Sequence, residues 1–210
     1  MFITFEGGEG TGKTTQVKLL AERLRAEGRD VVLTREPGGT PEAEALRNLL
    51  VSGDTARWTA DEELLLNFAA RGSHIRGVIQ PALDAGKIVI CDRFVDSSFV
   101  YQCVAGGASE ALFAELIDSV VPRPIPDFTF VLDIDPSEAM ARAKLRNDGD
   151  AKHARADRFE RKGAEFHDKV RQGFVAVAKA QQKRCHLIDA SDSAEAIAAR
   201  IWAKLHGCGE

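Results

Sequence analysis

Five short apolar runs along the chain predict five β-strands. Stretches long enough for a helix separate successive runs, and strands that alternate with helices form parallel sheets. The pattern therefore predicts an α/β fold with a five-stranded parallel sheet flanked by helices. The runs are Phe2–Phe5, Val31–Thr34, Ile88–Cys91, Phe128–Ile134 and His186–Ile188.

The connections carry apolar residues at helical spacing. After the first run such residues recur every three or four positions, and Gly28 can end that helix. A second helix is predicted from Asp61 to Ala85, and Pro81 is the one residue expected to bend it, because proline lacks the backbone N–H that a helix uses. A third helix is predicted from about Arg158 to Lys183.

Between Met140 and Arg158 the chain becomes polar and rich in cations. We expect this segment to form a short basic lid over about residues 142–158. No internal repeat, low-complexity tract or linker divides the sequence, so residues 1–210 are predicted to form a single domain. The cations of the segment are Arg142, Lys144, Arg146, Lys152, Arg155 and Arg158.

Composition limits the classes of function. Hydrophobic residues make up 44% of the 210 residues and charged residues 29%, which is ordinary for a soluble globular protein. The formal net charge of −4 argues against the broad basic surface that binds nucleic acid. The four cysteines have no CxxC pair or zinc-like spacing, and no apolar run approaches the ~18 residues of a membrane span. We therefore expect a cytoplasmic protein with reduced thiols and with neither nucleic acid nor membrane as a partner.

The most specific motif lies between the first predicted strand and its helix. Residues 7–14 read GGEGTGKT and satisfy G-x-x-x-x-G-K-[ST]. In such a loop the backbone N–H groups surround phosphate oxygens, Lys13 places a cation at the β- and γ-phosphates, and Thr14 is expected to ligate Mg²⁺. The motif predicts a P-loop NTPase fold that binds a nucleotide through Gly7, Gly8, Glu9, Gly10, Thr11, Gly12, Lys13, Thr14 and Thr15.

The same loop serves switches, motors and kinases, so a phosphate acceptor has to be inferred from other residues. Asp92 and Arg93 follow the third strand at the carboxyl edge of the sheet, where ligands of open α/β folds bind. Arg93 can donate two hydrogen bonds to a phosphate, and Asp92 can hold a metal-bound water or orient Arg93. A pair that only closes the strand end is the alternative. Three further arginines could converge on a second phosphate, namely Arg35, Arg47 and Arg71.

With these residues in view, the sequence resembles the bacterial thymidylate kinase family over nearly its whole length. The resemblance rests on residues 5–15, 34–40 and 43–50, on Asp92-Arg93, and on the run from Ser97 to Gln102, with order and spacing kept. It implies a homodimeric kinase that uses ATP and Mg²⁺ to convert dTMP into dTDP, in dTTP biosynthesis.

The resemblance also implies roles for single residues. Glu9 would face the sugar 3′-hydroxyl of dTMP, Arg93 and Arg47 would hold its phosphate, and Phe68 would stack on thymine. Asn67, just before Phe68, stands where many relatives are aromatic. The base edge would be read by Arg71, Ser98 and Gln102, and Tyr101 would lie beside the sugar and disfavour a 2′-hydroxyl.

Gly10 occupies the P-loop position where some family members carry a catalytic arginine. The resemblance therefore implies that a lid arginine, Arg146, Arg155 or Arg158, stabilises the transferring phosphoryl group. Glu165 could help to hold a second Mg²⁺.

Two other functions fit parts of the sequence. A kinase for another nucleoside monophosphate would share the phosphate machinery, and Ser98, Tyr101 and Gln102 are what favour thymidylate over it. A nucleotide-gated switch is the alternative from another class. No N-K-x-D guanine signature is present, and a switch has little use for an arginine clamp and a basic lid.

Overall fold

The computed structural model describes residues 1–148, 158, 159 and 161–207, and for residues 143–148 it describes the backbone alone. Its five parallel strands form one sheet in the order β2-β3-β1-β4-β5. The predicted five-stranded parallel sheet is confirmed, and each predicted strand boundary lies within one residue of the observed one. The strands are β1 (Phe2–Glu6), β2 (Val31–Arg35), β3 (Ile88–Asp92), β4 (Phe128–Asp133) and β5 (Cys185–Asp189).

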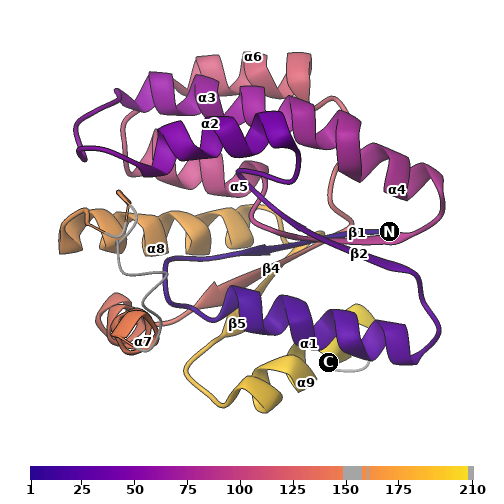
Figure 1. The fold of residues 1–210 in the computed structure, drawn as a ribbon. Coiled ribbons are helices and arrows are strands. Elements are labelled where there is room, and N and C mark those ends of the chain that lie inside the picture. The colour runs from indigo at the N-terminus through magenta and orange to yellow at the C-terminus, as the bar shows by residue number, and fades with distance from the viewer. Residues whose placement is uncertain (149–157, 160, 208–210) are drawn as a thin grey trace.

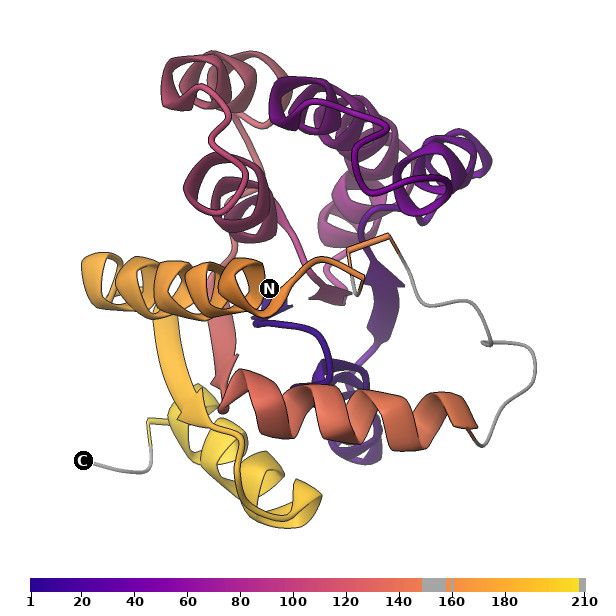
Figure 2. The ribbon, with the colours of Figure 1, turned by 90° about the vertical axis from the view of Figure 1, so that its left-hand side faces the viewer.

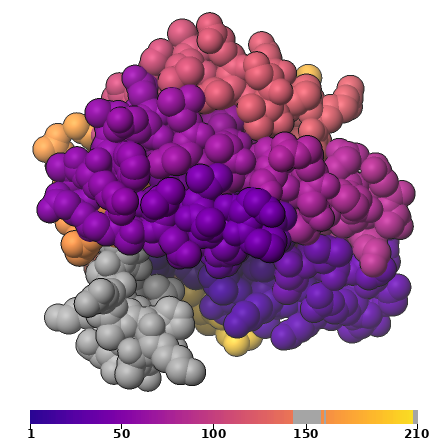
Figure 3. Space-filling view, turned by 45° about the horizontal axis from the view of Figure 1, so that its top comes forward, coloured from indigo at the N-terminus to yellow at the C-terminus, as the bar shows by residue number. Residues whose placement is uncertain are grey.

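Helices cover both faces of the sheet (Figure 1). Because side chains alternate along a strand, Ile3 and Phe5 pack on one face against α1 (Lys13–Ala26) and α9 (Ala194–Leu205), while Phe2 packs on the other face. That other face is covered by α2 (Pro41–Val51), α3 (Ala60–His74), α6 (Glu110–Val120) and α8 (Ala164–Ala180). In the space-filling view α2 lies in front, with α3 and α6 above it and α1 below (Figure 3).

The predicted helix over residues 61–85 is confirmed as three consecutive segments. After α3 come the π-helical segment η1 (Ile75–Ile79) and α4 (Gln80–Asp84). Thr59 caps α3, with its hydroxyl accepting from the Glu62 N–H and the Glu62 carboxylate accepting from the Thr59 N–H. Pro81 cannot donate a helical hydrogen bond, and the wider π-helical turn stands directly before it.

The third predicted helix begins later than expected. Arg158 and Phe159 lie in a turn, and α8 starts at Ala164 behind the N-cap Gly163. No helix in the described part of the chain is long and apolar enough to cross a membrane.

All five strands end at the same edge of the sheet, which Figure 2 views from the front. β1 leads through the P-loop into α1, β3 leads into α5 (Val95–Ser98) and the π-helical η2 (Phe99–Val104), and β4 leads into α7 (Pro136–Asp148). β1 is central, with β3 and β4 as its neighbours. The loops that follow these three strands therefore meet, and in an open α/β sheet such a place binds ligands.

Candidate active site

The P-loop turns tightly from β1 into α1. Gly7, Gly10 and Gly12 have φ angles of 134°, 72° and 93°, a region that glycine adopts readily. At Gly10 an added Cβ atom would lie 2.0 Å from the backbone oxygen of Ala139 in α7. An arginine at position 10 would therefore displace α7.

Lys13 begins α1 and is held within the loop. Its Nζ donates to the backbone oxygens of Gly7 at 3.1 Å and Gly8 at 2.7 Å, and the residue is only 7% exposed. Burial first, and then the charge of Arg93, lower the pKa of this ammonium, and nearby carboxylates, Glu9 first, partly oppose them, so that the pKa is about 8. The cation thus lies against the backbone that surrounds nucleotide phosphates in this motif.

The side chains of Thr14 and Asp92 bring oxygen atoms together beside the loop. The Thr14 hydroxyl donates to Oδ2 of Asp92 at 2.9 Å. Mg²⁺ prefers oxygen ligands and commonly takes only one or two from the protein, with water and phosphate oxygens for the rest. The two side chains therefore fit the predicted Mg²⁺ site.

Arg93 is the only non-glycine residue in the described chain with a positive φ, 72°. Such a conformation costs on the order of 1–3 kcal/mol and persists where the surroundings enforce it. The buried carboxyl group of Glu6 does so, because it accepts from the Phe94 N–H at 2.8 Å and from both the N–H and the hydroxyl of Ser97. Burial raises the pKa of Glu6 to about 8, and the charge of Asp96 acts in the same direction.

The Arg93 side chain turns back across the end of β1 to the P-loop. Its guanidinium donates to the Gly7 oxygen at 2.9 Å and to Oε1 of Glu9 at 2.6 Å. The Tyr101 hydroxyl donates to the same Glu9 oxygen at 3.1 Å. Burial raises the pKa of Glu9, but the charges of Arg93 and Lys13 outweigh it and lower that pKa to about 2. Glu9 is therefore an ionised carboxylate at neutral pH.

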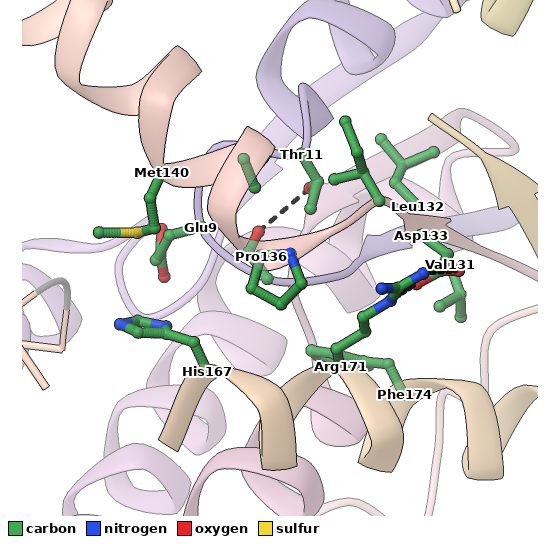
Figure 4. Close-up of a pocket in the computed structure, with 13 residues that line it drawn as sticks. Glu9, Thr11, Val131, Leu132, Asp133, Pro136, Met140, His167, Arg171 and Phe174 are labelled. Carbon is green, nitrogen blue, oxygen red and sulfur yellow. Dashed lines mark hydrogen bonds and ion pairs between the residues drawn. The ribbon is translucent and has the colours of Figure 1, made fainter. Parts of the chain in front are cut away.

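A small pocket lies on the other side of Glu9, between the P-loop, β4, α7 and α8 (Figure 4). His167 of α8 points toward Glu9, and Arg171 pairs with Asp133 at 2.7 Å. Nε2 of His167 is buried, with no hydrogen-bond partner in the described chain.

A larger pocket of about 110 Å³ opens on the β3 side of Glu9. We call it the acceptor pocket. Of the residues expected to bind substrate, seven line it, namely Glu9, Arg47, Arg71, Arg93, Ser98, Tyr101 and Gln102. Glu36, Asn67, Ser97 and Phe159, for which we expected no role there, line it too.

Arg71 is fixed at the back of the acceptor pocket, 2% exposed. Its Nε donates to Glu36 at 2.7 Å, and its Nη2 donates to the Phe94 oxygen at 3.1 Å and to the Ser98 hydroxyl at 3.0 Å. Nη1 is buried and has no partner among the described residues. A buried donor without a partner is costly, so a ligand oxygen there would stabilise it.

Two of the expected substrate residues lie elsewhere. Phe68 is 1% exposed and packs in the core edge-on to Phe113. This packing contradicts the expectation that Phe68 stacks on the base. Consecutive helical residues point about 100° apart, and on α3 it is Asn67 that faces the acceptor pocket. Arg35 is also absent from the pocket lining, because its half-exposed guanidinium pairs with Glu44 at 3.0 Å.

Comparison with known proteins agrees with this geometry. The family model described as thymidylate kinase matches residues 5–201. The chain belongs to the thymidylate kinase family. It is 46% identical to the thymidylate kinase of Caulobacter vibrioides, over 95% of this chain and 93% of that protein. It is 44% identical to the enzyme of Ruegeria pomeroyi, over 96% of this chain and 92% of that protein. The crystal structure of thymidylate kinase from Ehrlichia chaffeensis superposes with a TM-score of 0.77 at 38% identity, covering 98% of both chains.

Of the three arginines expected in the lid, the structure describes the side chain of one, Arg158. Arg155 and the side chain of Arg146 lie outside the described residues. Arg158 is fully buried, and its guanidinium donates to the Leu50 oxygen at 2.9 Å, the Thr55 oxygen at 3.2 Å and the Glu63 carboxylate at 2.5 Å. From these contacts we infer that Arg158 holds the wall of the acceptor pocket in place. We had expected it to lie beside the γ-phosphate instead.

Glu165 is not placed with the other expected metal ligands of this thymidylate kinase family member. Its side chain is 85% exposed and pairs with Lys169 on the same helix. The described chain contains no group of three or more His, Cys, Asp or Glu residues suited to a metal ion. Thr14 and Asp92 remain the candidate ligands.

Proposed function

We propose that this protein is a dTMP kinase, which transfers the γ-phosphoryl group of ATP to dTMP and releases dTDP and ADP. The observation that carries the proposal is the position of Arg93, which contacts the P-loop at Gly7 and lines the acceptor pocket with the same guanidinium. A donor site and an acceptor site therefore share one arginine. The relatives named above, all thymidylate kinases, support the same function.

On the donor side we expect the P-loop N–H groups and Lys13 to hold the ATP phosphates. Thr14 and Asp92 would ligate Mg²⁺, which supplies positive charge to the phosphate oxygens when bound. On the acceptor side, Arg47 and Arg93 would hold the dTMP phosphate, and Glu9 with Tyr101 would meet the sugar. Arg71, Ser98 and Gln102 would contact the base.

In the transfer step an oxygen of the dTMP phosphate attacks the γ-phosphorus, the bond to the β–γ bridging oxygen breaks, and ADP leaves with that electron pair. Such a reaction needs mainly alignment and charge neutralisation from the protein. Arg93 and Lys13 place two cations on the reacting phosphates. Because Gly10 has no space for a side chain, further charge would come from Arg146 or Arg155.

A nucleotide panel tests this function. The protein is incubated with ATP, Mg²⁺ and one nucleoside monophosphate at a time, and diphosphate formation is followed by chromatography. We expect dTDP to form fastest. Faster turnover of another monophosphate would favour the related kinase activity, and no acceptor dependence at all would favour a nucleotide-gated switch.

We also propose that the protein acts in the cytoplasm as a homodimer. Leu65, 48% exposed on the outer face of α3, is one apolar side chain that a second copy could cover. Sedimentation of the purified protein checks the dimer, and a single species with the monomer mass of 22.8 kDa would contradict it.

A further inference from the structure

A buried carboxylate, Glu63, lies behind the acceptor pocket. It is on α3 and 2% exposed, and it contacts Gln102 of η2, which is also 2% exposed and lines the pocket. Nε2 of Gln102 donates to Oε2 of Glu63 at 3.0 Å. The expected base reader is therefore held by a residue that lies outside the pocket lining.

Glu63 itself cannot turn away from Gln102. Its other oxygen accepts from Nη2 of Arg158 at 2.5 Å, and Lys162 lies 3.9 Å from the same oxygen. Arg158 is in turn held by the backbone oxygens of Leu50 and Thr55. A carboxylate fixed in this way between cations stays at one side of the Gln102 amide.

This contact decides which end of the Gln102 amide faces the pocket. A carboxylate paired with a guanidinium accepts hydrogen bonds and donates none, so only the NH₂ group of Gln102 can point at Glu63. The carbonyl oxygen Oε1 is then left for the pocket, and no donor in the described chain reaches it. Gln102 therefore offers a bound base an acceptor.

Arg71, which lines the same pocket, completes the pattern, because its Nη1 is a buried donor without a described partner. One donor and one acceptor match the edge of thymine or uracil, which has the O4 acceptor next to the N3–H donor. Cytosine has the opposite pattern, with a donor amino group at C4 and an acceptor at N3. Buried groups left unpaired by the wrong base disfavour its binding strongly.

We propose that Glu63 is a positioning residue for base specificity, which orients the Gln102 amide so that the acceptor pocket takes a base with N3–H and rejects cytosine. The inference rests on the proposed dTMP kinase function. It adds a residue that touches neither the substrate nor the P-loop.

The test compares dTMP with dCMP as acceptors in Glu63→Gln. A glutamine at position 63 can donate as well as accept, so the Gln102 amide can turn over. We expect the ratio of kcat/KM for dTMP to that for dCMP to fall about tenfold or more, with KM for ATP unchanged. Glu22→Gln, at an exposed site of α1, is the matched control and should keep the wild-type ratio. Glu63→Asp keeps an acceptor-only group and should preserve most of the discrimination.

Glu63→Gln leaves Arg158 buried without its charge partner, which can prevent folding. The double variant Glu63→Gln/Arg158→Gln removes both charges and should show the same loss of discrimination. In the wild-type protein, the Gln102 side-chain amide protons, assigned by their absence in Gln102→Leu, should exchange slowly with solvent. A wild-type ratio in the folded Glu63 variants, or rapid exchange of those protons, would overturn the inference. Failure of the wild-type protein to prefer dTMP would instead overturn the proposed function.

Discussion

The guanidinium of Arg93 lies 2.6 Å from the carboxylate of Glu9 and joins the end of β3 to the P-loop. The same guanidinium reaches Gly7 on the nucleotide side and Tyr101 on the acceptor side. The positive φ of Arg93 directs the side chain there, and the hydrogen bonds to Glu6 hold it. One strained residue thus contacts both of the predicted substrate sites.

Arg93→Ala should weaken the acceptor side of the site. We expect KM for dTMP to rise about tenfold to a hundredfold and kcat to fall, because charge-assisted hydrogen bonds to the phosphate are lost. ATP affinity should stay near the wild-type value. Titration calorimetry with each nucleotide separates the two, and equal weakening of ATP and dTMP binding would assign Arg93 a structural role only.

Lys13→Ala should abolish transfer and leave the fold intact. The Lys13 ammonium contacts only the P-loop and its neighbours, and its removal takes the cation from the β- and γ-phosphates. The melting temperature should lie near the wild-type value. Activity close to wild type in the folded variant would remove Lys13 from the mechanism.

Arg158 should behave as a structural residue. Arg158→Ala removes the guanidinium that pairs with the buried carboxylate of Glu63, and we expect it to lower the free energy of unfolding by about 3–5 kcal/mol. Of Arg146→Ala and Arg155→Ala, one should lower the single-turnover rate by on the order of 10³-fold. Urea unfolding and single-turnover kinetics together separate these roles. A stable Arg158→Ala protein with the largest loss of rate would restore Arg158 as the catalytic arginine.

Glu6 should make stability depend on pH. Burial raises its pKa from 4.5 in the unfolded chain to about 8 in the folded protein, so the folded state holds the extra proton between these values. The contribution of Glu6 to the free energy of unfolding is complete below the unfolded pKa and is lost as pH rises to about 8. Glu6→Gln keeps an acceptor for Phe94 but does not titrate. The free energy of unfolding of Glu6→Gln, measured by urea unfolding at a series of pH values, should not show this decline. If it fell between these two pKa values as steeply as that of the wild-type protein, the assignment of the pH dependence to Glu6 would be wrong.

The sequence predicted the sheet and the P-loop because both depend on local patterns. The hydrogen bonds from Lys13 to Gly7 and Gly8 both lie within the P-loop motif. Asp92 and Arg93 stand where β3 ends, so the strand pattern alone places them at the carboxyl edge of the sheet. The predicted family membership is likewise confirmed.

The remaining features depend on partners far apart in the chain. Glu36 and Arg71 are separated by 35 positions, and Glu63 and Arg158 by 95, so no local pattern pairs them. The prediction that Phe68 stacks on the base failed for a similar reason. Its type suits a stacking residue, but the rotation of α3 about its axis depends on packing against α6 and decides that Asn67 faces the pocket.

Transfer of label from [γ-³²P]ATP to dTMP is the most direct test of the proposed function. The protein is mixed with labelled ATP and Mg²⁺, with and without dTMP, and the products are separated by chromatography. We predict that the label appears in dTDP only when dTMP is present and that Lys13→Ala shows none. Label released as inorganic phosphate at the same rate with or without dTMP would contradict the account, because the protein would then hydrolyse ATP without a phosphate acceptor.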